Sequence, residues 1–333
     1  MPGPGGLERP IPGSGSVDGS APGFGARLSA HVAARGSQLV LGLDPDPARL
    51  WPRAVELAGG TATVARATAE RAALAVTEHC GLAIEAVAEE CIAVKLQVAC
   101  FERLGGPGWA ALGEVAGRAR ERGLLVIADA KRGDIDVTAA AYAQAFIGET
   151  PTVYGTVPGL GVDALTVNPL LGADSLGPMV ACARTAGAGL FVLVRTSNPG
   201  AADVQELVCA DGGSVSERLA SIVAELGEPA SRAAPLSDVG AVVGATAPER
   251  LQALRRLMPR AVLLMPGVGA QGGSLLELAA AFEPGPAGGL VAVSRGIVNA
   301  YEQTGGDPAD AARREAARLR ELTWELARRG SLE

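Results

Sequence analysis

The 333-residue sequence has almost no lysine, few aromatic residues and only two histidines. Of its 29 cationic side chains only Lys95 and Lys131 are lysine, and the rest are arginine. Three Trp, three Tyr and five Phe in a chain of net charge −7 argue against nucleic-acid binding, which needs basic patches and stacking rings. Neither His31 nor His79 has a second ligand at metal spacing, so we expect no metal site.

Long apolar runs and paired cysteines are also missing. No stretch approaches 18 uncharged apolar residues, and the first 25 residues lack the charged start and apolar run of a signal peptide. The five cysteines are scattered and odd in number, which is typical of reduced thiols in a cytoplasm. We therefore expect a cytoplasmic protein that binds neither membranes nor nucleic acids.

The sequence does contain a repeating pattern of short apolar runs. Residues 1–24 are rich in Gly, Pro and Ser and predict a flexible tail, which leaves 25–333 as one domain. Eight continuous apolar runs follow, at 39–43, 91–96, 123–128, 163–168, 189–194, 238–243, 261–265 and 289–293. Such runs predict strands buried on both faces, and the segments between them predict one helix each. Eight such units predict an α/β protein with a (β/α)8 TIM barrel; a doubly wound open sheet is the alternative.

Two further segments stand out from this alternation. Residues 197–236, after the fifth strand, predict a lid-like insertion of loop and helix. Residues 307–329 predict a closing helix, with Asp307 at its cap and Pro308 in its first turn.

Charged residues cluster where the second and third strands end. Asp129 and Lys131 are two apart on a strand and so share one face, Asp134 follows three residues later, and Lys95 lies near the end of the second strand. A structural salt-bridge network is the simpler interpretation, but buried ion pairs stabilise proteins only weakly. Both lysines of the chain fall in this cluster, and lysine, unlike arginine, can give up a proton. We therefore predict a catalytic cluster.

A glycine-rich loop follows the seventh strand. The segment 265–273, MPGVGAQGG, matches a dinucleotide-binding pattern, but the next strand ends in Ser294 and Arg295 instead of an acidic residue, so that interpretation fails. In a barrel, the loops after strands seven and eight form a phosphate site. Glycine backbone amides, the amide of Gln271 and the guanidinium of Arg295 suit phosphate oxygens. We predict a phosphorylated small-molecule substrate; a glycine-rich turn beside a surface arginine is the alternative.

An ordered set of segments carries a resemblance to a known family. DAKRGDI at 129–135 is similar to the signature Asp-x-Lys-x-x-Asp-Ile of the orotidine 5'-phosphate decarboxylases. The resemblance covers nearly the whole chain from about residue 22 and is greatest to the longer bacterial type 2 subfamily. Its other segments are Asp44, Lys95, TVNPLLGADS at 166–175, VRTSNPGA at 194–201, VVGAT at 242–246, PGVGAQGG at 266–273 and VSRGI at 293–297.

The resemblance implies a cofactor-free decarboxylation of orotidine 5'-monophosphate to UMP by a homodimer whose two sites lie at the interface. It implies that Lys131 protonates pyrimidine C6, that Asp129 and Asp134 flank the substrate carboxylate, and that Lys95 holds Asp129 and the ribose region. The same resemblance gives the other substrate contacts: Asp44 at a ribose hydroxyl, Ser175 near the base, Gln271 and Arg295 at the phosphate with Pro266, Gly267 and Ser294 beside them, and Asp134 and Thr138 lent across the interface.

Two other functions stay open. A metal-dependent sugar-phosphate enzyme on the same barrel, such as hexulose-phosphate synthase, shares Asp-x-Lys-x-x-Asp but has a metal-binding acid in strand two, where this chain has Lys95. A catalytically inactive barrel that only binds nucleotides would have a broken charged cluster, whereas all four positions are intact here. Asn168 and Arg195 follow the fourth and fifth strands and belong either to the site or to the scaffold.

Overall fold

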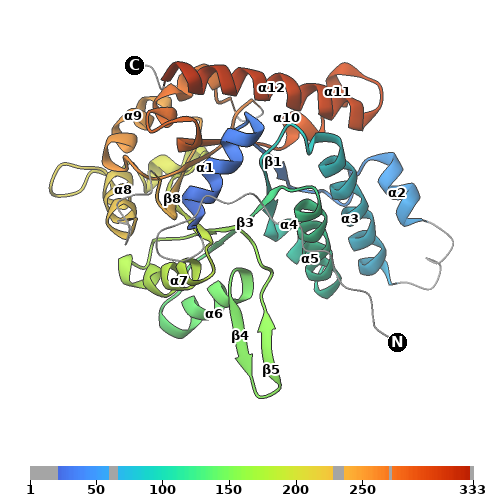
Figure 1. The fold of residues 1–333 in the computed structure, drawn as a ribbon, viewed down its shortest axis with the longest axis horizontal. Helices are drawn as coiled ribbons and strands as arrows, with labels where there is room; N and C mark the ends of the chain where they lie inside the picture. The colour runs from blue at the N-terminus through green and yellow to red at the C-terminus, as the bar shows by residue number, and fades with distance from the viewer. Residues whose placement is uncertain (1–21, 60–66, 228–235, 270–271, 331–333) are drawn as a thin grey trace.

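Eight parallel strands close into a barrel in the computed structural model, which describes residues 22–59, 67–227, 236–269 and 272–330 (Figure 1). Each strand coincides with one of the eight predicted runs, so the (β/α)8 barrel is confirmed. Almost all strand residues are buried, because the barrel interior covers one face and helices cover the other. Around the barrel the strands are β1 (Leu39–Leu43), β2 (Ala93–Gln97), β3 (Leu125–Arg132), β6 (Ala164–Val167), β7 (Gly189–Arg195), β8 (Val239–Val243), β9 (Leu263–Pro266) and β10 (Gly289–Val293).

Helices connect successive strands and surround the barrel (Figure 1). Between β9 and β10 the predicted helix is replaced by two 3-10 helices, η3 (Leu275–Phe282) and η4 (Pro286–Gly288), which flank Pro284. Proline lacks the N–H that an α-helix would need there. The α-helices on the strand connections are α2 (Pro52–Ala58), α3 (Thr68–Val87), α4 (Val98–Glu102), α5 (Gly106–Glu121), α6 (Asp136–Phe146), α7 (Ala173–Thr185), α8 (Val215–Leu226) and α9 (Pro248–Leu257).

Helix α1 (Phe24–Arg35) lies across the amino-terminal end of the barrel (Figure 1). Phe24, Leu28 and Val32 are buried against residues at the starts of the strands, and the ring of Phe24 meets that of Phe191 edge to face at 5.9 Å. The helix begins at Phe24, the last residue assigned to the flexible tail, while residues 1–21 lie outside the described structure. With this end covered, the accessible end of the barrel is the one where the strands terminate.

A β-hairpin between α6 and β6 was not predicted from the sequence. Strands β4 (Glu149–Thr152) and β5 (Gly155–Pro158) pair antiparallel and extend away from the barrel beside α6 (Figure 1). Every residue of both strands is exposed. Their Thr, Pro and Gly content gives no apolar run, and so no signal of the kind that marked the barrel strands.

The segment 197–236 contains a 3-10 turn, η2 (Pro199–Asp203), and helix α8. Helix α8 packs against β7 and β8, which is the position of a regular barrel helix, so within the described part of this segment the loop before α8 is what is added to the βα repeat. Residues 228–235 of this segment lie outside the described structure.

The chain ends in α10 (Arg295–Val298), α11 (Tyr301–Thr304) and the long helix α12 (Pro308–Gly330). The carboxylate of Asp307 caps α12 by accepting the backbone N–H groups of Ala309 and Asp310 at 2.9 and 3.1 Å. Within the described part of the chain, no helix has the length and apolar character needed to cross a bilayer.

Candidate active site

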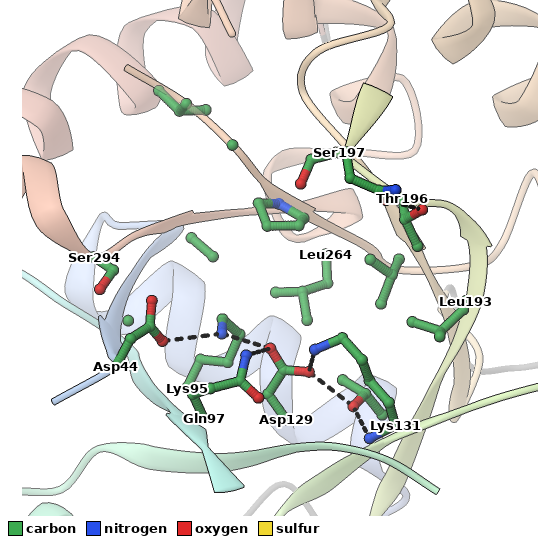
Figure 2. Close-up of a pocket in the computed structure, with 18 of the residues that line it drawn as sticks. Asp44, Lys95, Gln97, Asp129, Lys131, Leu193, Thr196, Ser197, Leu264 and Ser294 are labelled. Carbon is green, nitrogen blue, oxygen red and sulfur yellow. Dashed lines mark hydrogen bonds and ion pairs between the residues drawn. The ribbon is translucent and has the colours of Figure 1, made fainter. Parts of the chain in front are cut away.

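A cavity of about 390 Å³ opens at the carboxyl ends of the barrel strands. Eight of the twelve predicted site residues line it: Asp44, Lys95, Asp129, Lys131, Pro266, Gly267, Ser294 and Arg295. Figure 2 shows four charged side chains in a row along one wall, from Asp44 through Lys95 and Asp129 to Lys131. The strand-end position of these residues, read from the sequence, therefore brings them into one site.

Asp129 is the centre of this row. Its Oδ2 accepts Lys95 Nζ at 2.6 Å and Gln97 Nε2 at 3.2 Å. Its Oδ1 accepts Lys131 Nζ at 2.6 Å and the hydroxyl of Thr166 at 3.0 Å (Figure 2). Four donors use the four acceptor positions of the carboxylate, so Asp129 is fixed in orientation and has no lone pair left to serve as a base.

The ionised state of this cluster follows from its charges. Burial raises the pKa of Asp129, but the ammonium groups of Lys95 and Lys131 lower it by more and hold it well below the usual range. For Lys95 the signs are reversed: burial lowers its pKa, while Asp129 and Asp44, whose Oδ1 is 3.8 Å away, raise it by more. The side chains of Lys95 and Asp129 are under 10% exposed, whereas that of Lys131 is 43% exposed and is free to meet a ligand.

Lys131 lies in an irregular turn at the end of β3. The spacing predicted a shared face on a regular strand, but the ladder with β6 shifts register between Ala128 and Arg132. Lys131 has a φ of +51°, in the left-handed region that a non-glycine residue rarely adopts. Its ammonium still bonds Asp129, but it does so because the strand bulges here, and not because the two side chains alternate onto one face of a regular strand. Strained backbone of this kind concentrates at functional sites.

The rim of the cavity after β9 and β10 carries residues that were predicted to bind phosphate. Pro266 ends β9 and Gly267 follows it, and Ser294 and Arg295 follow β10. Gly267 has a φ of +102°, which a side chain would oppose, so glycine keeps the backbone close to the cavity. Arg295 is exposed and makes no ion pair with any described residue, which leaves its guanidinium available to an anion. Gln271 lies outside the described residues.

Three predicted residues lie outside the cavity. The carboxylate of Asp134 accepts the backbone N–H of Ile135 at 2.8 Å, and Thr138 is exposed on the first turn of α6. Ser175 is 3% exposed, and its hydroxyl donates to the Gly172 carbonyl at 2.6 Å at the start of α7. Within one chain, therefore, the structure brings none of these three to the row of charges.

Sequence reasoning missed Gln97 and Thr166, both of which line the cavity and donate to Asp129. Their only signal was position, since Gln97 ends β2 and Thr166 lies in β6 beside β3. Thr196, Ser197 and Asn198, which follow β7, also line the cavity.

The two undecided residues have structural partners. Arg195 donates to Glu206 through Nε and Nη2 at 3.0 and 2.8 Å, and the side chain of Asn168 accepts the backbone N–H of Leu170 at 3.0 Å. Neither lines the cavity. Among the described residues, no three His, Cys, Asp or Glu side chains are grouped so that they could hold a metal ion.

Comparison with known proteins gives one consistent result. Residues 37–314 match the model of the orotidine 5'-phosphate decarboxylase / HUMPS family. An orotidine 5'-phosphate decarboxylase of Rhodopirellula baltica is 42% identical over 84% of this chain and 89% of its own length, and that of Deinococcus radiodurans is 48% identical over 64% and 74%. A crystal structure from Streptomyces avermitilis, described as an orotidine 5'-phosphate decarboxylase, matches 95% of this chain and 100% of its own with a TM-score of 0.73 and 34% identity.

Proposed function

The chain belongs to the orotidine 5'-phosphate decarboxylase / HUMPS family, and we propose that Lys131, Asp129, Lys95 and Asp134 carry its reaction. The protein is a carboxy-lyase that converts orotidine 5'-monophosphate to UMP and CO2, the last step of UMP biosynthesis. The observation that supports these residue roles best is the row Lys95–Asp129–Lys131, in which the buried carboxylate of Asp129 binds the ammonium of Lys131, a side chain 43% exposed at the cavity.

The proposed chemistry starts with cleavage of the bond between C6 and the carboxylate. The bonding electrons stay on C6, CO2 leaves, and the resulting vinyl carbanion has no π-system to accept its charge. A fixed ammonium at Lys131 stabilises that charge electrostatically and then transfers a proton from Nζ to C6. The neutral amine regains its proton from water. The reaction involves no net oxidation or reduction, so the ammonium of Lys131 and a proton from water are sufficient for it.

Asp129 holds Lys131 in this role from one side of the substrate. With all four acceptor positions filled, it stays ionised beside the place proposed for the leaving carboxylate. Two like charges held close together raise the ground-state energy, and the repulsion is released when CO2 departs. Lys95, in contact with both Asp129 and Asp44, keeps the carboxylate in place and faces the ribose.

Remote contacts hold the rest of the nucleotide. We assign the phosphate to Arg295, Gln271 and the backbone around Gly267, and a ribose hydroxyl to Asp44. Arg295 offers two parallel N–H donors to a phosphate, whose binding energy keeps the base in register with Lys131. Pro266 and Ser294 complete this rim of the cavity.

We also propose a homodimer in which Asp134 and Thr138 complete the partner's site. Both side chains lie outside their own cavity, on a rim with exposed apolar groups. Val137 is 82% exposed and Leu170 78%, and Ile135 and Leu171 are at least half exposed. The segment that carries Asp134 and Val137 lies against the segment that carries Leu170 and Leu171, since a Cβ at Gly133 would be 2.8 Å from the Asn168 carbonyl oxygen. Such a patch around functional residues favours a self-complementary twofold contact.

Mixing two inactive variants tests the shared site. Lys131→Ala and Asp134→Ala subunits, unfolded together and refolded at equal amounts, should recover about a quarter of wild-type activity, because half the dimers are mixed and each has one intact site. Lys131→Ala mixed with Asp129→Ala is the control, since both residues act from the same subunit and no rescue follows. An unrescued first mixture would contradict the exchange of Asp134.

Metal removal separates this enzyme from its metal-dependent relatives. We expect decarboxylation, followed as the fall in orotidine 5'-monophosphate absorbance, to be unchanged after dialysis against EDTA, because Lys95 stands where those relatives carry an acidic ligand. Loss of activity that added Mg²⁺ restores would instead favour a metal-dependent enzyme.

A cytoplasmic location, which we also propose, agrees with the free thiols at all five cysteines.

A further inference from the structure

The turn that carries Lys131 faces a single residue of the neighbouring strand. Ala128 pairs with Leu165 and Arg132 pairs with Val167, so residues 129–131 lie opposite Thr166 alone. The bulge takes the backbone N–H of Lys131 out of the regular β3–β6 ladder, and its φ of +51° is unfavourable for a residue with a side chain. Such a conformation persists only where its surroundings hold it in place.

The hydroxyl of Thr166 supplies the bonds that the ladder lacks. Its oxygen accepts the backbone N–H of Lys131 at 2.9 Å, and its single proton goes to Asp129 Oδ1 at 3.0 Å. Thr166 is 1% exposed, so water has little access to replace either bond. One hydroxyl therefore fixes both the backbone of the lysine and the carboxylate that holds its ammonium.

The ammonium of Lys131 depends on these bonds for its position. Its side chain is 43% exposed, so packing leaves much of the four-carbon stem unconstrained. Its Nζ bonds Asp129 Oδ1 at 2.6 Å, the same oxygen that accepts the Thr166 hydroxyl. Both ends of Lys131, the backbone N–H and the ammonium, are thus tied through Thr166.

We propose, on the basis of the proton-donor role given above to Lys131, that Thr166 is a positioning residue for the decarboxylation. Its hydroxyl sets the place of the ammonium against C6 and takes no part in the proton transfer. Because a displacement of about 1 Å at a reacting group costs on the order of 100-fold in rate, the effect should fall on kcat. The residues assigned to the phosphate and ribose follow β1, β9 and β10, whereas Thr166 lies in β6, so KM should change little.

Three variants test this role. Thr166→Val removes the hydroxyl and keeps the β-branched shape, and Thr166→Ser keeps the hydroxyl. Thr323→Val is the matched control, because Thr323 is also fully buried and hydrogen-bonded, to the Leu319 carbonyl in α12. We expect Thr166→Val to lower kcat by roughly 30- to 100-fold with KM for orotidine 5'-monophosphate within about threefold, and the other two to stay near wild type.

A wild-type kcat in Thr166→Val, or a Thr166→Ser enzyme as slow as Thr166→Val, would overturn the role of the hydroxyl. A crystal structure of Thr166→Val measures positioning independently of turnover: Lys131 should leave the left-handed region or its ammonium should leave Asp129, and an unchanged turn would also contradict the role. Failure of the proton-donor assignment has a different signature, full activity in Lys131→Ala, whatever Thr166→Val does.

Discussion

Replacement of Lys131 by alanine is expected to lower kcat/KM for orotidine 5'-monophosphate by at least about 10⁴-fold. The variant loses two contributions at once. A positioned general acid supplies roughly 10²- to 10⁴-fold, and a preorganised charge at the developing carbanion supplies a further 10²- to 10³-fold. In free-energy terms the loss is at least about 5.5 kcal/mol of transition-state stabilisation.

The measurement is the fall in substrate absorbance at enzyme concentrations high enough to detect slow turnover. Arg53→Ala serves as the control, because Arg53 is an exposed cation whose ion-pair partner among the described residues is Glu56, also on α2. Binding of the product UMP should survive in Lys131→Ala, since the phosphate and ribose contacts are untouched. A Lys131→Ala enzyme within about tenfold of wild type would remove Lys131 from the chemistry.

Asp129→Asn is expected to weaken both the fold and the reaction. The substitution keeps the shape but leaves Lys95, whose side chain is 7% exposed, with Asp44 at 3.8 Å as its one remaining carboxylate partner among the described residues. Removing one partner of a buried ion pair costs about 3–5 kcal/mol, because the desolvated charge that remains is uncompensated. The same change releases Lys131, so we expect kcat to fall by roughly 10³-fold as well.

Urea unfolding of single and double variants separates these effects. Lys95→Met and Asp129→Asn should each destabilise, and the double variant should be less destabilised than their sum by about 1–3 kcal/mol, because it leaves no unpaired charge between them. Asp310→Asn is the matched surface control: its pair with Arg313 is more than half exposed and should contribute under about 1 kcal/mol. Strict additivity of Lys95→Met and Asp129→Asn would show that the two residues are not coupled.

The sequence predicts the barrel well because each strand is buried on both faces. A continuous apolar run is then required eight times, and the structure contains a strand at each of the eight. The hairpin Glu149–Pro158 has no buried face and hence no pattern to detect. Strand ends could also be located, and with them the charged row and the cavity residues to which we assign the phosphate, because in this architecture all eight strands terminate at one end.

The parts of the site that could not be predicted depend on irregular geometry. Thr166 and Gln97 are neutral residues whose importance comes from the atoms they face, and Thr166 faces them only because β3 bulges beside it. Regular strand alternation predicted that Lys131 and Asp129 share a face. Their side chains do meet, but the backbone of Lys131 is in the left-handed region and not in a regular strand conformation. Asp134 itself could be predicted, because it stands three residues after Lys131, but its position outside its own cavity could not be predicted from the spacing of one chain.

The scarcity of lysine leads to the most direct test of the central claim, that Lys131 is the proton donor. Lys131→Arg keeps a positive charge at the cavity but replaces the transferable proton with a guanidinium that does not deprotonate in proteins. Wild type and Lys131→Arg are compared for conversion of orotidine 5'-monophosphate to UMP at equal enzyme concentration. We predict complete conversion by the wild type and none by Lys131→Arg over the same time. An inactive wild type, or a Lys131→Arg enzyme that decarboxylates at the wild-type rate, would contradict the account.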